Sequence, residues 1–308
     1  MNGVTVALHE VSKTYGRHAA VKGVDLVLRE GERVALVGHN GAGKSTLIKL
    51  MLGLVRPVAG SVQVLGENPA HRGALRARSQ VGYLPENVAL QPTLTGEELL
   101  AFYARLKRRP VSENPELLER VGIAHAARWR VGTYSKGMRQ RLALAQALIG
   151  SPRVLLLDEP TTGLDPALRQ TFYCILQDLS AKGVTVLLSS HVLTELEGQT
   201  DRVVVMSQGC KVADGTMTEL RRLAQRPVRI KFTIHDDHVD LFPQIAGTSL
   251  AWRRVSGRTF EISCTEQEKV SVVRQLFTDG ALSVADVEII PPTLDDIYAH
   301  FLCAEAAE

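Results

Sequence analysis

Residues 38–46 read Gly-His-Asn-Gly-Ala-Gly-Lys-Ser-Thr, and this segment constrains the fold of the chain more than any other. It matches the pattern G-x-x-x-x-G-K-[ST], whose backbone amides bind phosphate groups when the loop joins a strand to a helix. An apolar strand-like run at 33–37 precedes it, and a helix-like run at 47–50 follows it. A glycine turn that merely connects a strand to a helix is the alternative. The context favours the phosphate-binding loop.

The chemistry of such a loop assigns a task to each polar residue. Backbone N–H groups of the glycine turn and the helix start would surround the phosphates of ATP, while Lys44 places a charge near the β- and γ-phosphates. The Ser45 hydroxyl would bind Mg²⁺. We therefore expect the nucleotide to contact the whole segment, which comprises Gly38, His39, Asn40, Gly41, Ala42, Gly43, Lys44, Ser45 and Thr46.

Length and charge limit the possible classes. The chain has 308 residues, 45% of them hydrophobic, which is enough for one large or two modest domains. Lys and Arg number 36 against 33 Asp and Glu, a balance that predicts no nucleic-acid partner. The basic clusters at 105–109 and 221–222 are explained by solvated helix faces. No stretch approaches the roughly 18 apolar residues of a membrane span, so we expect a cytoplasmic protein.

The four cysteines are widely scattered and form no C-x-x-C pair. This spacing fits free thiols in a reducing compartment better than disulfides or a zinc site. Any metal is therefore expected to be the Mg²⁺ that accompanies the nucleotide. The residues are Cys174, Cys210, Cys264 and Cys303.

The order of apolar runs predicts an α/β nucleotide-binding core interrupted by helices. Strand-like runs occur at 4–8, 24–28 and 60–66 around the glycine loop, and a helical pattern extends from about 95 to 150. Short β-branched or leucine-rich strands then alternate with helices, as in a buried and mostly parallel sheet. These strands lie at 154–157, 184–188 and 202–206.

The pattern changes after residue 226. The predicted order βαββαβ indicates a small ferredoxin-like α+β accessory domain. We therefore expect a nucleotide-binding domain at 1–225, with a helical subdomain at about 87–150, and an accessory domain at 226–308. A last helix is predicted to begin with Thr293 as its N-cap, following Pro291 and Pro292.

Two carboxylates end the apolar run 154–157. Asp158 suits Mg²⁺ binding through its water shell, and Glu159 suits accepting a proton from the attacking water or positioning that water. A surface Asp-Glu pair at a strand end is the alternative. The presence of Lys44 in the same chain favours hydrolysis of a phosphoanhydride.

With these motifs the chain resembles an ATP-binding-cassette (ABC) ATPase over about residues 3–225. Tyr15 matches the aromatic residue on which adenine stacks, and His191 matches the switch histidine that contacts the γ-phosphate. The signature segment of the family corresponds to residues 134–141, and its dimer-contact loop corresponds to residues 161–165. A structural histidine is the alternative for His191, but its place after the run 187–190 favours the switch.

The resemblance implies a homodimer. In this family the signature lies far from the phosphate loop of its own subunit, so Ser135 and the Gly137 backbone would cap the γ-phosphate bound by the partner. ATP would then hold two subunits together, and hydrolysis would release them.

Three residues depart from the family pattern. Glu86 replaces the glutamine that senses Mg²⁺, Lys136 replaces a signature glycine, and Met138 replaces a glutamine. A further carboxylate at Glu86 should raise the demand for Mg²⁺, and Lys136 is hypothesised to offset its charge across the dimer. A Lys136 side chain that simply faces water is the alternative.

The resemblance also implies an integral membrane permease as partner, contacted beside Glu86 and about 87–99, and a peripheral location on the inner face of the membrane. The ending 292–298 resembles cassettes that serve small exporter-type permeases. Segments 82–87, 133–141 and 144–148 resemble the ATPase subunit of the nitrous oxide reductase maturation transporter, which works with a permease and a periplasmic partner on a copper–sulfur centre.

Three other functions stay open. A lipid, drug, antibiotic or sodium exporter cassette would share nearly every motif. A soluble ABC ATPase acting on ribosomes or DNA is a second alternative, and a binding module without turnover is a third. The accessory domain either tightens the homodimer or senses a ligand.

Overall fold

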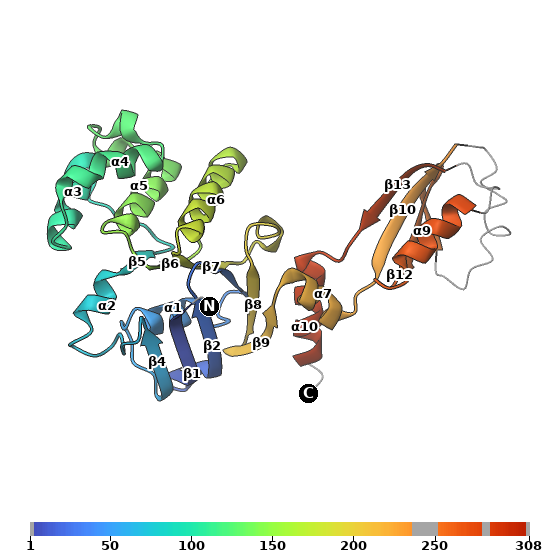
Figure 1. Cartoon of the computed structure of the whole chain (residues 1–308), viewed down its shortest axis with the longest axis horizontal. Coiled ribbons are helices and arrows are strands. Elements are labelled where there is room, and N and C mark those ends of the chain that lie inside the picture. The colour runs from blue at the N-terminus through green and yellow to red at the C-terminus, as the bar shows by residue number, and fades with distance from the viewer. Residues whose placement is uncertain (1–2, 236–251, 279–283, 306–308) are drawn as a thin grey trace. The chain divides into compact units, whose positions relative to one another are not determined.

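The computed structural model describes residues 3–235, 252–278 and 284–305 (Figure 1). The chain divides into two compact units, Met1–Thr216 and Met217–Glu308. The division falls earlier than the predicted boundary at 225/226 because α7 (Met217–Ala224) packs against α10 (Leu294–Glu305). The Arg221 side chain donates a hydrogen bond to the carbonyl of Pro292, at 3.0 Å, immediately before α10.

A largely parallel sheet forms the centre of the N-terminal unit. Its order is β5-β6-β7-β3-β8-β9, and the first five strands run parallel. The predicted strands are confirmed, whereas β5 and β9 were missed. Gln208 and Gly209, which precede β9, both have positive φ and turn the chain back as a two-residue hairpin. The strands are β3 (Arg33–Val37), β5 (Val81–Leu84), β6 (Val154–Leu157), β7 (Thr185–Ser190), β8 (Arg202–Ser207) and β9 (Cys210–Gly215).

An antiparallel sheet of order β2-β1-β4 completes the core of this unit. It comprises β1 (Val4–Tyr15), β2 (His18–Arg29) and β4 (Ala59–Val64), and α1 (Lys44–Met51) contacts β2 and β4. Leu26, Leu28, Leu36, Leu47 and Ile48 join one buried cluster. This cluster fixes the start of α1 against the sheets.

Helices occupy the region where the sequence predicted a helical insert. Figure 1 shows α3, α4 and α5 gathered together, away from α1 and the antiparallel sheet. Thr95 and Glu98 form a reciprocal capping box at the start of α3, which explains why that helix begins there. The helices of this unit are α2 (Leu75–Ser79), α3 (Gly96–Leu106), α4 (Asn114–Arg120), α5 (Lys136–Leu148) and α6 (Pro166–Ala181), with 3₁₀ turns η1 (Val111–Glu113), η2 (Ala124–Ala126), η3 (Val131–Thr133) and η4 (Leu193–Glu195).

The described part of the C-terminal unit is an antiparallel sheet with helices. The strand order β11-β12-β10-β13 places β12 between β10 and β11, the split arrangement that βαββαβ predicts. The first predicted helix of that order lies outside the described residues. Phe232 and Phe260 stack at 5.7 Å within the core beside Val272 and Leu276. The elements are β10 (Val228–Ile234), β11 (Trp252–Ser256), β12 (Thr259–Cys264), α9 (Lys269–Thr278) and β13 (Val284–Ile290).

Thr293 caps the last helix, as the sequence predicted. Its hydroxyl accepts a hydrogen bond from the Asp296 amide at 3.2 Å, and the Asp296 carboxylate accepts one from the Thr293 amide at 3.0 Å. Within the described ranges, every helix is too short or too polar to cross a bilayer.

Candidate nucleotide site

The site lies where parallel strands of the large sheet end together. The loop after β3 leads into α1, β6 leads into Asp158 and Glu159, and β7 leads into His191. Gly43 has φ +102°, and a Cβ there would collide with the carbonyl oxygen of Ala20. The loop therefore needs glycine at this position for both conformation and space.

Lys44 turns back into the loop that precedes it. Its Nζ donates to the carbonyl of Gly38 at 2.5 Å and to that of His39 at 3.3 Å, and lies 3.6 Å from Glu159 Oε1. The side chain is buried. A charge held this way lies beside the backbone amides of the loop, where an anion would bind.

Oxygen ligands suited to Mg²⁺ meet at the end of β6. The Ser45 hydroxyl lies 3.2 Å from Asp158 Oδ1, to which the Ser189 hydroxyl also donates at 2.7 Å. Mg²⁺ prefers hard oxygen ligands and keeps several waters, so a hydroxyl and one carboxylate fit this ion. When bound beside phosphates, the ion would neutralise charge that develops there.

Glu159 is held from both sides of its carboxylate. One oxygen faces Lys44, and the other lies 2.7 Å from His191 Nδ1. The residue is 7% exposed, and its backbone has φ +49°, a conformation that costs a non-glycine residue about 1–2 kcal/mol. The Glu159 amide donates to the Ser189 hydroxyl at 2.9 Å, which helps to hold this strained backbone.

A cavity of about 250 Å³ brings the predicted residues together. Glu86 and Glu159 line it beside the glycine loop, and Tyr15, which is 46% exposed, lies at its edge. Gly38, Asp158 and His191 adjoin this group through their hydrogen bonds. The lining residues are Tyr15, His18, Ala20, His39, Asn40, Gly41, Ala42, Gly43, Lys44, Ser45, Thr46, Glu86 and Glu159.

The signature residues lie elsewhere in the chain. Ser135 is the N-cap of α5 and accepts a hydrogen bond from the Met138 amide at 3.2 Å. A Cβ on Gly137 would lie 3.0 Å from Leu168 of α6, and the Lys136 side chain packs over Gly163. Neither Ser135, Lys136 nor Gly137 lines the cavity. Lys136 thus contacts the 161–165 segment of its own chain, a contact that the sequence did not suggest.

Sequence reasoning missed three residues that support the site. Ser189 joins Asp158 to the Glu159 backbone, and the buried Gln140 donates to the carbonyl of Pro160 at 2.8 Å. Glu195 binds Thr161 and Arg169. A polar residue closing the apolar run of β7 is a signal for Ser189. Only tertiary structure reveals the other two.

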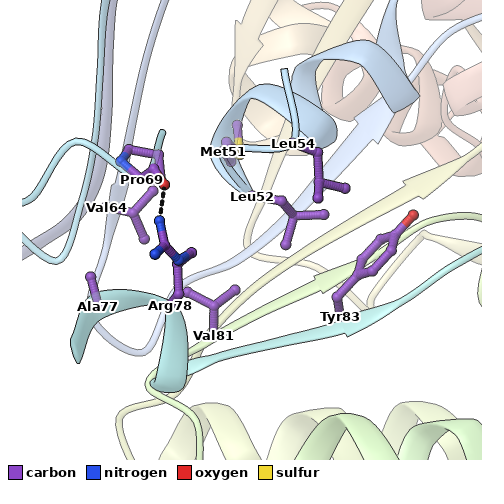
Figure 2. Close-up of a pocket in the computed structure, with 9 residues that line it drawn as sticks. All are labelled: Met51, Leu52, Leu54, Val64, Pro69, Ala77, Arg78, Val81 and Tyr83. Carbon is purple, nitrogen blue, oxygen red and sulfur yellow. Dashed lines mark hydrogen bonds between the residues drawn. The ribbon is translucent and has the colours of Figure 1, made fainter. Parts of the chain in front are cut away.

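A second, apolar cavity of about 190 Å³ opens beside the C-terminal end of α1 (Figure 2). Tyr83 of β5 lines one side with its hydroxyl pointing away from Arg78 and Pro69, and the Arg78 guanidinium donates to the carbonyl of Pro69 at 2.8 Å. Burial and the negative charges of Asp158 and Glu86 raise the pKa of the Tyr83 phenol. The lining residues are Met51, Leu52, Leu54, Val64, Pro69, Ala77, Arg78, Val81 and Tyr83.

Comparison with known proteins identifies the family. The family model described as ABC transporter matches residues 21–162. The daunorubicin resistance ATP-binding protein DrrA3 of Streptomyces coeruleorubidus is 34% identical, an alignment that covers 97% of this chain and 96% of that protein. The chain belongs to the ABC transporter ATP-binding family. This ABC subunit therefore binds ATP with Mg²⁺ and hydrolyses ATP, and the predicted cassette fold is confirmed.

Two further matches extend the comparison. The Nod factor export ATP-binding protein I of Rhizobium meliloti is 36% identical over 96% of this ABC subunit and 87% of its own length. A dimeric bacterial ABC transporter cassette superimposes with a TM-score of 0.64 and 26% identity, covering 69% of this chain and 98% of that one. Both are relatives in sequence or structure.

Proposed function

We propose that two copies of this chain close over two ATP molecules and drive an exporter-type membrane permease from the inner face of the membrane. The supporting observation is that the cavity gathers the phosphate loop, Glu86 and Glu159 from one chain while Ser135 lies outside it. A second copy would supply the missing hydroxyl. The solved relative described as dimeric supports this arrangement.

The contacts around the cavity support a role for each residue. Lys44 would bind the β- and γ-phosphates, Tyr15 would stack on adenine, and Ser45 with Asp158 would hold Mg²⁺. Glu159, oriented by its contact with His191, would accept the proton of the attacking water or position that water. Glu86 would face the ion from the cavity wall.

Closure of the dimer would complete the site. Ser135 and the Gly137 backbone of one copy would then meet the γ-phosphate bound by the other. Loss of that phosphate would remove the contact that bridges the copies, and the subunits would separate. The opening motion is the output that a permease would use.

The apolar cavity of Figure 2 is our proposed contact for the permease, with an apolar cytoplasmic segment of that protein as its occupant. Leu54 is 66% exposed at its rim, which leaves hydrocarbon in water until a partner covers it. Tyr83 belongs to the strand that leads directly to Glu86 in the nucleotide cavity. Movement at the permease would thereby reach the nucleotide. Residues 87–99 stay a predicted part of the same contact.

The names of the relatives favour drug or signal export over metal-site maturation as the transport role. One is named for daunorubicin resistance and another for Nod factor export. Maturation of nitrous oxide reductase, with a periplasmic partner of the permease, is the second candidate, and it rests on segments 82–87, 133–141 and 144–148. Drug sensitivity of a deletion strain, compared with the copper content of its nitrous oxide reductase, would separate the two roles.

Recovery of the subunit with native membranes tests the proposal. Tagged protein should retain an integral membrane permease, and Leu54→Asp should lose it while still binding ATP. Leu223→Asp is the matched control, because Leu223 is 56% exposed on α7 of the C-terminal unit and is not among the residues that line the cavity. Retention of ribosomal components in place of a membrane protein, with ATPase activity that depends on RNA, would contradict the proposal.

A further inference from the structure

Two catalytic loops are tied together by more than the contact between Glu159 and His191. Residues 160–165 follow Glu159, and η4 follows His191 by two residues. Thr161 in the first segment is buried, and its hydroxyl donates to Glu195 Oε2 of η4 at 3.2 Å. The two segments are thus joined at two points, one at the strained Glu159 itself and one at Thr161, two residues later.

Glu195 also reaches the far end of the 160–165 segment. Its other carboxylate oxygen forms an ion pair with Arg169 of α6, and Arg169 donates to the carbonyl of Leu164 at 3.1 Å. The Glu195 and Arg169 side chains are 13% and 28% exposed, so this pair is partly shielded from water. A single carboxylate therefore holds the segment at Thr161 and, through Arg169, at Leu164.

The geometry makes His191 dependent on this segment. A shift of residues 161–165 would pull on η4 through Glu195, and η4 is connected to His191 by Val192 alone. His191 in turn orients Glu159 through a 2.7 Å contact. A displacement at the segment surface would therefore change the position of the carboxylate that faces the attacking water.

We propose that Glu195 is a positioning residue that makes the His191–Glu159 contact depend on the placement of residues 161–165. This inference rests on the proposed function, in which a second copy contacts that segment during closure. Contact by the partner would hold the segment still, and hydrolysis would then proceed only in the closed pair. Glu195 touches neither ATP nor the ion in this scheme.

Glu195→Gln removes the ion pair and keeps an acceptor for Thr161. We expect at least a tenfold fall in kcat, ATP affinity within twofold of the parent, and weaker cooperativity in ATP concentration. Thr161→Val, which removes only a buried hydroxyl, should act in the same direction. Asp178→Asn is the matched control, since Asp178 is an exposed carboxylate on α6 and its loss should leave the rate unchanged.

The decisive comparison uses His191→Ala, with single-turnover assays that resolve slow rates. If Glu195 acts through His191, adding Glu195→Gln to His191→Ala will change the rate less than twofold. A full tenfold effect in both backgrounds would overturn the inference, as would parent-like cooperativity in both single variants. Failure of the proposed function would appear separately, as a Glu159→Gln protein that stays monomeric with Mg-ATP.

Discussion

Removing the Ser189 hydroxyl at the end of β7 should damage the nucleotide site although no residue that would bind ATP is substituted. Ser189→Ala deletes the hydrogen bond donated to Asp158 and leaves the buried Glu159 amide without its acceptor. A hydrogen bond to a charged group contributes about 1.5–3 kcal/mol, and an unpaired buried donor costs about 1–3 kcal/mol. Partial entry of water reduces the sum, so we expect a loss of roughly 3 kcal/mol.

Native-state hydrogen exchange of the β7 amides measures this loss directly. Because about 1.4 kcal/mol corresponds to a factor of ten, protection should fall roughly a hundredfold. ATPase activity should fall at least tenfold, since the Glu159 backbone loses the contact that fixes it. Ser190→Ala is the comparison, because among the described residues its hydroxyl hydrogen-bonds to the backbone of Val192 alone, at 3.0 and 3.3 Å. Equal protection in the two variants would refute the reasoning.

Three other predictions concern the loop, the cation site and pH. Gly43→Ala should abolish measurable ATP binding in calorimetry because its Cβ meets the Ala20 carbonyl. Gly66→Ala, which also places alanine at a positive φ (+81°) but in open space, should bind ATP normally. Glu86→Gln should lower the Mg²⁺ concentration needed for half-maximal ATPase rate. Non-additive effects of Glu86→Gln and Lys136→Gly on the ATPase rate would support coupling of the two charges across the dimer, and purely additive effects would refute that coupling. Burial raises the pKa of Asp214, but hydrogen bonds from Arg202 and Lys211 outweigh this effect and lower the pKa below the ordinary value of 3.8. The ionised Asp214 therefore stabilises the folded protein fully above pH 3.8, and this stabilisation is lost as the pH falls through the pKa of the folded state. The difference in melting temperature between the parent and Asp214→Asn should therefore be large at pH 6 and shrink toward pH 3.

Local sequence predicted the loop and most of the strands because their signals are local. The glycine spacing at 38–46 fixes a turn, and the apolar run 154–157 coincides with β6. Thr293 was predicted as an N-cap from its place before an apolar helical face, and Asp296 three residues later completes the cap. Elements of this kind depend on neighbours within a few residues.

Contacts between distant segments were beyond such reasoning. Glu195 meets Thr161 across 34 positions, and Gln140 meets Pro160 across 20, with no periodic pattern to mark either pair. The packing of Lys136 over Gly163 depends on how α5 approaches the loop after β6. The hairpin strand β9 was missed because its turn begins at Gln208, and a glutamine does not suggest the positive φ that this residue adopts.

The oligomeric state of Glu159→Gln with Mg-ATP tests the central claim most directly. Light scattering on the eluting protein should give the mass of two chains with Mg-ATP and of one chain without nucleotide. Adding Ser135→Arg should restore the single-chain mass although each chain still binds ATP, because the arginine would obstruct the γ-phosphate of the partner. A single-chain mass for Glu159→Gln at saturating Mg-ATP would contradict the account.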